Sequence, residues 1–218
     1  MPTIDTQIDR TKAKLCAGLA PDKIEKIGIY LEGLKCKFWE AEYALSKIRE
    51  LATINQRTTA TSPQEHYADE SHLRFYVDSF FAFLYSTLDV MAQVLDKRYS
   101  LINDEQGVKF KRMVEKLAQG PPYAGTAVEC KCTALKNNRT FIELEKYRNC
   151  STHRRHIYIE LPTRRGSRGY PEAPAHWLIC DDPYSLAPTL RKNRKLIDYC
   201  EKTHKKMRDA VLKILRSV

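Results

Sequence analysis

The most apolar stretch of the chain runs from Phe75 to Leu95, and it constrains the fold more than any other segment. Its apolar side chains cover most of the circumference of a helix, which is typical of a helix in the middle of a bundle. Two carboxylates, Asp78 and Asp89, lie within the stretch. Because charged groups in a lipid-exposed span are costly, we predict a buried helix over residues 67–99 and no membrane contact.

One narrow stripe of this predicted helix is polar or small. Five residues follow one another at steps of four, four, three and four, which places them on one helix face: Asp78, Ala82, Ser86, Asp89 and Gln93. The stripe either faces solvent or lines an active cleft, and the pattern alone leaves both interpretations open.

Further helices are expected around the central one. The predicted ranges are 3–19, 22–54 with Asp22 as N-cap, 106–119, 140–153, and a last helix that opens near Pro188 and runs to Val218. Residues 124–137 are ambiguous, and two β-branched segments, 156–161 and 176–180, predict a two-stranded insertion. The expected fold class is therefore all-α, with a small β-hairpin insertion at about 155–182. Residues 1–60 are predicted to pack, as N-terminal helices, on a helical domain of residues 61–218.

Positive charge is concentrated in the last third of the chain. The 37 basic and 27 acidic residues give a net charge of +10, and the segment from Arg148 to the end alone holds 16 basic and 7 acidic residues. A basic region on a nearly neutral body indicates a polyanionic partner. Basic residues are also dense between Arg191 and Arg208, in the predicted final helix. We expect about half of them to face solvent and the others to extend a phosphate-binding surface.

The seven cysteines are scattered, and no apolar secretory signal opens the sequence. We therefore expect reduced thiols and a cytoplasmic location. Cys130 and Cys132 form the only close pair, and no second pair lies at zinc-finger spacing. We expect neither a metal nor a cofactor.

A run of chemically active side chains occupies one predicted helix face, with the i, i+3, i+4, i+7, i+8 spacing that usually carries apolar residues: Glu145, Arg148, Asn149, Thr152 and His153. Asn149 and His153 lie one turn apart, so the amide is expected to contact the imidazole and to fix which ring nitrogen carries the proton. Arg148 is long enough to reach the same place. Taken alone, such a polar face is most often simply solvated.

An arginine and a histidine that meet at one point suit phosphodiester chemistry. The guanidinium stabilises charge that develops on phosphate oxygens. An imidazole changes its charge near neutral pH and serves as a general acid or base. Because the 2′-hydroxyl of RNA supplies the nucleophile, this chemistry requires no metal.

The spacing Arg148-Asn149-x-x-x-His153 resembles the R-(polar)-x-x-x-H signature of the HEPN superfamily, and the likeness extends over roughly residues 67–218. It implies an up-and-down helical bundle and a metal-independent endoribonuclease in which two copies of the chain form one composite site. By this resemblance His153 is the general acid or base, Arg148 holds the scissile phosphate and Asn149 orients His153. The products would be a 2′,3′-cyclic phosphate and a 5′-hydroxyl end. Some family members carry a tyrosine two residues after the histidine, where this chain has Arg155.

Other residues are assigned around this motif. Five arginines are predicted to bind the RNA backbone, with a solvated basic loop as the alternative: Arg154, Arg155, Arg164, Arg165 and Arg168. Glu145, Thr152 and His156 are auxiliary candidates, the last only if the helix continues beyond His153.

The expected partners are RNA or a nucleotide, a second copy of the chain, and an antitoxin-like protein in a defence or toxin–antitoxin setting. Two other functions compete with a ribonuclease. One is a non-catalytic HEPN-like module that binds RNA or nucleotides, and the other is a helical scaffold whose basic end contacts an acidic protein.

Overall fold

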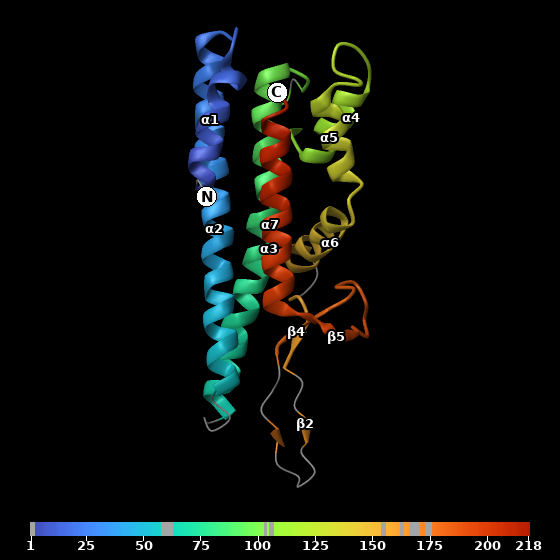
Figure 1. The fold of residues 1–218 in the computed structure, drawn as a ribbon. Helices are drawn as coiled ribbons and strands as arrows, with labels where there is room; N and C mark the ends of the chain where they lie inside the picture. Colours follow the sequence, from blue (N-terminus) through green and yellow to red (C-terminus); the bar gives the residue numbers. More distant parts are fainter. Residues whose placement is uncertain are drawn as a thin grey trace. The chain divides into compact units, whose positions relative to one another are not determined.

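The structure, a computed structural model, describes residues 3–57, 63–102, 104, 107–153, 156–161, 164–165, 171–172 and 176–218. Seven helices lie within these ranges (Figure 1): α1 (Ile4–Cys16), α2 (Pro21–Arg57), α3 (Pro63–Tyr99), α4 (Phe110–Ala118), α5 (Ala127–Lys136), α6 (Arg139–His153) and α7 (Leu196–Leu215). The predicted all-α class is confirmed. None of the helices in the described ranges is long and apolar enough to cross a membrane.

Several helix boundaries differ from those expected from the sequence: α3 begins at Pro63 rather than at residue 67, and α4 begins at Phe110 rather than at residue 106. Helix α2 begins at Pro21, and Asp22 lies in its first turn rather than at the N-cap; proline suits a first helical position because its missing N–H has no helical partner there. The ambiguous segment before residue 137 forms α5, whose N-cap Thr126 accepts a hydrogen bond from the Glu129 N–H at 3.3 Å. Helix α7 begins at Leu196, and not near Pro188, because residues 190–195 form a strand.

The β insertion is larger than the predicted pair of strands. Five short strands lie within the described residues: β1 (Ile159–Glu160), β2 (Arg164–Arg165), β3 (Pro171–Glu172), β4 (Leu178–Cys180) and β5 (Leu190–Lys195). Strand β4 lies between β1 and β5 in an antiparallel sheet, while β2 and β3 form a separate antiparallel pair. The three side chains of β4 are buried, which explains why this sheet forms next to a helical core.

The chain divides into two compact units. The first comprises Met1–Trp39, Phe83–Ile142 and Lys205–Val218, and the second comprises Glu40–Ala82 and Glu143–His204. The division predicted from the sequence, into N-terminal helices of residues 1–60 and a helical domain of residues 61–218, stays a prediction.

In the first unit, a carboxylate of α3 fixes the start of α4. The N-cap residue of α4, Lys109, makes no capping hydrogen bond with its side chain. Instead, Asp89 Oδ1 accepts a hydrogen bond from the Phe110 N–H at 3.1 Å, and Asp89 Oδ2 lies 3.4 Å from the Lys109 ammonium. Asp89 thus satisfies one of the backbone donors that a helix start leaves without a partner.

In the second unit, Tyr147 joins α6 to both α3 and the sheet. Its ring stacks on Phe81 with the centroids 4.7 Å apart. Its hydroxyl donates a hydrogen bond to the Cys180 carbonyl oxygen at the end of β4. Burial raises the pKa of Tyr147, so the phenol remains a neutral donor. This contact holds the sheet against the helix that carries the Arg148 motif.

Arg194 of β5 makes the second connection in this unit. Its guanidinium binds Glu143 of α6 at 2.9 Å and Asp181 at 3.2 Å, and its Cζ lies 4.3 Å from the Tyr199 ring centroid. Arg191, on the same strand, binds the other oxygen of Asp181 at 2.6 Å. Both arginines were expected to belong to the final helix, and Arg194 in particular is paired with acidic side chains inside the unit.

Candidate functional site

Helix α6 places the Arg148 motif opposite a fully buried face. Leu144, Tyr147 and Cys150 are buried, and they fix the rotation of the helix about its axis. With that rotation, Arg148 and Asn149 are partly buried. In the last turn of the helix, His153 is exposed.

Asn149 contacts the guanidinium within this motif. Arg148 Nη1 donates a hydrogen bond to Asn149 Oδ1 at 2.8 Å. Among the described residues no hydrogen bond joins Asn149 to His153, so in this structure the amide orients the guanidinium rather than the imidazole. The exposed Thr152 donates its hydroxyl hydrogen to the Arg148 carbonyl oxygen at 2.7 Å, a local bond within the helix.

The other predicted site residues have different outcomes. Glu145 is partly buried on α6. Arg164 and Arg165 form β2 and pair with Glu172 and Pro171 of β3. Arg154, Arg155 and Arg168 lie outside the described residues.

His156 does not extend the α6 face, because the helix ends at His153. It is held instead by Asp78 of α3, whose Oδ2 lies 2.5 Å from His156 Nδ1. Asp78 Oδ1 accepts a second hydrogen bond from the Ile157 N–H at 3.1 Å. The Asp78 side chain is 14% exposed and that of His156 is 72% exposed. Burial raises the pKa of Asp78, and the hydrogen bonds from His156 and Ile157 oppose that rise.

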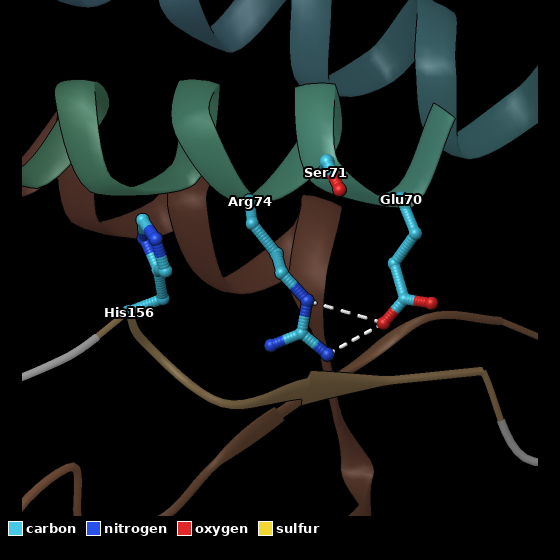
Figure 2. A pocket seen from close by; sticks show the side chains of 4 residues that line it. All are labelled: Glu70, Ser71, Arg74 and His156. Carbon is cyan, nitrogen blue, oxygen red and sulfur yellow. Dashed lines mark hydrogen bonds and ion pairs between the residues drawn. The ribbon is translucent and has the colours of Figure 1, made fainter. Parts of the chain in front are cut away.

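A pocket of about 560 Å³ opens beside this pair, and four of its lining residues are drawn in Figure 2: Glu70, Ser71, Arg74 and His156. Figure 2 shows the Arg74 side chain between Glu70 and His156. Arg74 Nε and Nη2 bind Glu70 Oε1 at 3.1 and 2.5 Å, and Nη2 also donates to the Ile159 carbonyl oxygen at 3.3 Å. Within the described part of the chain, Arg74 Nη1 makes no hydrogen bond.

The polar stripe on α3 is therefore not simply a solvent-facing surface. Asp78 lies behind His156 in the second unit, and Asp89 caps α4 in the first. Glu70 and Arg74 were not among the predicted site residues, although the sequence contains a signal for them. Glu70, Arg74 and Asp78 follow at steps of four and extend the same stripe toward the start of α3.

No group of three or more His, Cys, Asp or Glu side chains that could hold a metal ion lies within the described ranges. Cys130 is exposed and Cys132 is buried, so the two thiols of the close pair lie in different environments on α5. Burial raises the pKa of Cys132 to about 12.

A comparison with protein families matches residues 36–168 to a family described as Cthe2314-like HEPN. The matched range exceeds half of the chain and contains α3, α6 and the Arg148 motif. The chain belongs to this HEPN family. The resemblance inferred from the motif is thereby confirmed, and HEPN membership indicates a nuclease or a nucleotide-binding role. No curated protein and no solved structure matches the chain.

Proposed function

We propose that this HEPN protein is a metal-independent endoribonuclease, in which an RNA 2′-hydroxyl attacks the adjacent phosphate. The observation that carries the proposal is the arrangement on α6. A partly buried guanidinium is oriented by Asn149 at 2.8 Å, and an exposed imidazole lies in the last turn of the same helix. The first group suits a phosphate and the second suits proton transfer, so together they supply what the reaction needs.

In the proposed mechanism, Arg148 binds the scissile phosphate and stabilises the charge of the pentacoordinate state. The hydrogen bond from Arg148 to Asn149 restricts rotation of the guanidinium, which reduces the entropy lost when the phosphate binds. His153 transfers a proton at the reacting linkage. The products are a 2′,3′-cyclic phosphate and a 5′-hydroxyl end.

We propose that two copies of the chain complete the site, as HEPN domains commonly act as dimers. The exposure of His153 supports this arrangement, because the imidazole is accessible to an RNA strand and to a second copy. Basic residues after the motif would guide the RNA: Arg154, Arg155, Arg164, Arg165 and Arg168. An antitoxin-like protein that covers the end of α6 would regulate the enzyme in a defence or toxin–antitoxin system.

The test is incubation of the purified protein with total RNA in EDTA. Cleavage is expected in the wild type, and it is expected to be lost in Arg148→Ala and His153→Ala while RNA binding is kept. Lys146→Ala is the matched control, because it removes a cation from the same helix without touching the motif. Mass spectrometry of the ends is expected to show the cyclic phosphate. Cleavage by both motif variants at the wild-type rate would refute the proposal.

The polar pocket beside His156 favours a second candidate, a non-catalytic module that binds RNA or a nucleotide. The two functions separate in the same assay. Intact RNA at high protein concentration, together with binding that weakens as salt is added, supports the module.

A further inference from the structure

We infer that His156, held by Asp78, is the general base that deprotonates the 2′-hydroxyl, and that the pocket lined by Arg74 binds the nucleotide that carries this hydroxyl. The inference rests on the proposed ribonuclease function and deepens it. The reaction needs two proton transfers, one from the nucleophile and one to the leaving oxygen, and we assign the first to His156 and the second to His153.

The geometry around His156 is that of a supported imidazole rather than of a solvated one. Its Nδ1 lies 2.5 Å from the carboxylate of Asp78, whose side chain is 14% exposed, whereas the His156 side chain is 72% exposed. The neighbouring Ile157 N–H binds the other oxygen of the same carboxylate at 3.1 Å, so Asp78 fixes both the ring and the backbone. With Asp78 ionised, Nδ1 carries the ring hydrogen and donates it. The Nε2 lone pair is then available to accept a proton.

The short separation of His153 and His156 in the sequence limits the distance between them. They are three positions apart, so their Cα atoms are at most roughly 11 Å from each other, whatever path the chain takes between them. In-line attack on phosphorus places the nucleophile and the leaving oxygen on opposite sides. The proposal places His156 on the side of the nucleophile and His153 on the side of the leaving oxygen.

The pocket supplies the remaining elements of a substrate site. Its volume of about 560 Å³ lies in the range of small-molecule binding sites. Glu70 and the Ile159 carbonyl oxygen hold Arg74 in place through Nε and Nη2. Arg74 Nη1, which makes no hydrogen bond within the described ranges, offers a donor to a phosphate oxygen beside His156.

Two proton transfers accompany the exchange of bonds at phosphorus in the proposed step. His156 Nε2 accepts the proton of the 2′-hydroxyl while the 2′-oxygen forms its bond to phosphorus. The bond from phosphorus to the 5′-oxygen breaks, and His153, as an imidazolium, gives its proton to that oxygen. Water then removes the proton from His156 and returns one to His153, which restores both groups.

A substrate with a bridging 5′-sulfur separates the two roles, because a thiolate leaves without being protonated. On the natural linkage, His156→Ala and His153→Ala are each expected to slow cleavage by about 10²–10⁴-fold. On the sulfur linkage, His153→Ala is expected to recover to near the wild-type rate, whereas His156→Ala stays slow. His176→Ala, which removes another exposed imidazole of the same unit, is the matched control and is expected to cleave both substrates normally.

Asp78→Asn tests the positioning role of the carboxylate. The amide oxygen still accepts from the Ile157 N–H, but the amide NH₂ donates to His156 Nδ1 and moves the ring hydrogen to Nε2. We expect a rate loss on both substrates similar to that of His156→Ala. Added imidazole is expected to restore part of the activity of His156→Ala, which a purely structural role would not allow.

The outcomes are distinguishable. If the wild type leaves both substrates intact, the ribonuclease function and the base role are both wrong. If the wild type cleaves and His156→Ala cleaves the natural linkage equally fast, only the present inference is overturned. Recovery of His156→Ala on the sulfur linkage would also overturn it, because His156 would then be the acid.

Discussion

Arg194 and Arg191 provide a matched pair for measuring what holds the β-sheet against α6. Both lie on β5 and both bind Asp181, but the side chain of Arg194 is 12% exposed and that of Arg191 is 68% exposed. Arg194 also binds Glu143, whose side chain is 21% exposed. Removing Arg194 takes an ion pair from each of two carboxylates, whereas removing Arg191 takes one ion pair whose cation is exposed.

The expected costs differ because of this burial. Because Asp181 keeps Arg191 and Glu143 keeps the Tyr199 hydroxyl, Arg194→Ala leaves neither carboxylate without a partner; the loss of hydrogen bonds to charged groups should lower the free energy of unfolding by about 1.5–3 kcal/mol. An exposed pair contributes about 0.2–1 kcal/mol, which is the expected cost of Arg191→Ala. At about 2–4 °C per kcal/mol for a chain of this size, Tm should fall by about 3–12 °C in the first variant and by less than about 4 °C in the second.

Urea unfolding followed by circular dichroism measures both variants. The slopes of the two transitions should match that of the wild type, since a changed slope would show that the unfolding transition itself had altered. Arg194→Lys keeps the charge but loses the planar fork, so its stability should lie between those of the wild type and Arg194→Ala. Equal losses in Arg191→Ala and Arg194→Ala would refute the argument from burial.

Three further predictions concern titration and thiol reactivity. Burial raises the pKa of Asp78 above its ordinary value of 3.8, so protonation of this carboxylate is more favourable in the folded than in the unfolded state. The stability of the wild type relative to Asp78→Asn should therefore be greatest below pH 3.8 and should fall as pH rises through the raised pKa. Urea midpoints of both proteins test this, and a relative stability that grows with pH would contradict it. Iodoacetamide should modify the exposed Cys36 and Cys130 in the native protein, while the buried Cys132, with a pKa of about 12, should react only after unfolding. Mass spectrometry identifies the modified thiols, and labelling of Cys132 in the native protein would be inconsistent with the fold. RNA cleavage should follow a bell-shaped pH profile around neutrality, and a flat rate between about pH 5 and pH 9 would exclude His153 as a proton carrier.

The helices could be predicted from the sequence because their signals are local. The apolar circumference of residues 75–95 predicts a buried helix, and Phe80, Phe81, Leu84 and Leu88 are indeed fully buried in α3. Strand β5 could not be predicted in this way. Its sequence, Leu-Arg-Lys-Asn-Arg-Lys, has one apolar residue and no alternation. Its conformation follows from pairing with β4 and from the contacts of Arg194, which involve residues distant in the sequence.

The candidate site likewise has one part that local sequence spacing predicts and one part that it does not. The α6 motif lies within one helix, so helical spacing alone places Arg148 and Asn149 side by side. The Asp78–His156 pair joins residues 78 positions apart, and no local pattern specifies which distant segment a buried carboxylate will contact. The repeat of Glu70, Arg74 and Asp78 at steps of four extends the polar face of α3, but it does not specify which distant segment contacts that face.

The capping of α4 by Asp89 has an evolutionary consequence. A helix start can be satisfied by its own N-cap residue or by a side chain from elsewhere, and this chain uses the second solution because Lys109 makes no cap hydrogen bond with its side chain. Among homologous sequences, a capping side chain at position 109 should therefore be able to replace the carboxylate at position 89. Where position 109 becomes serine, threonine, asparagine or aspartate, the requirement for a carboxylate at position 89 should be relaxed.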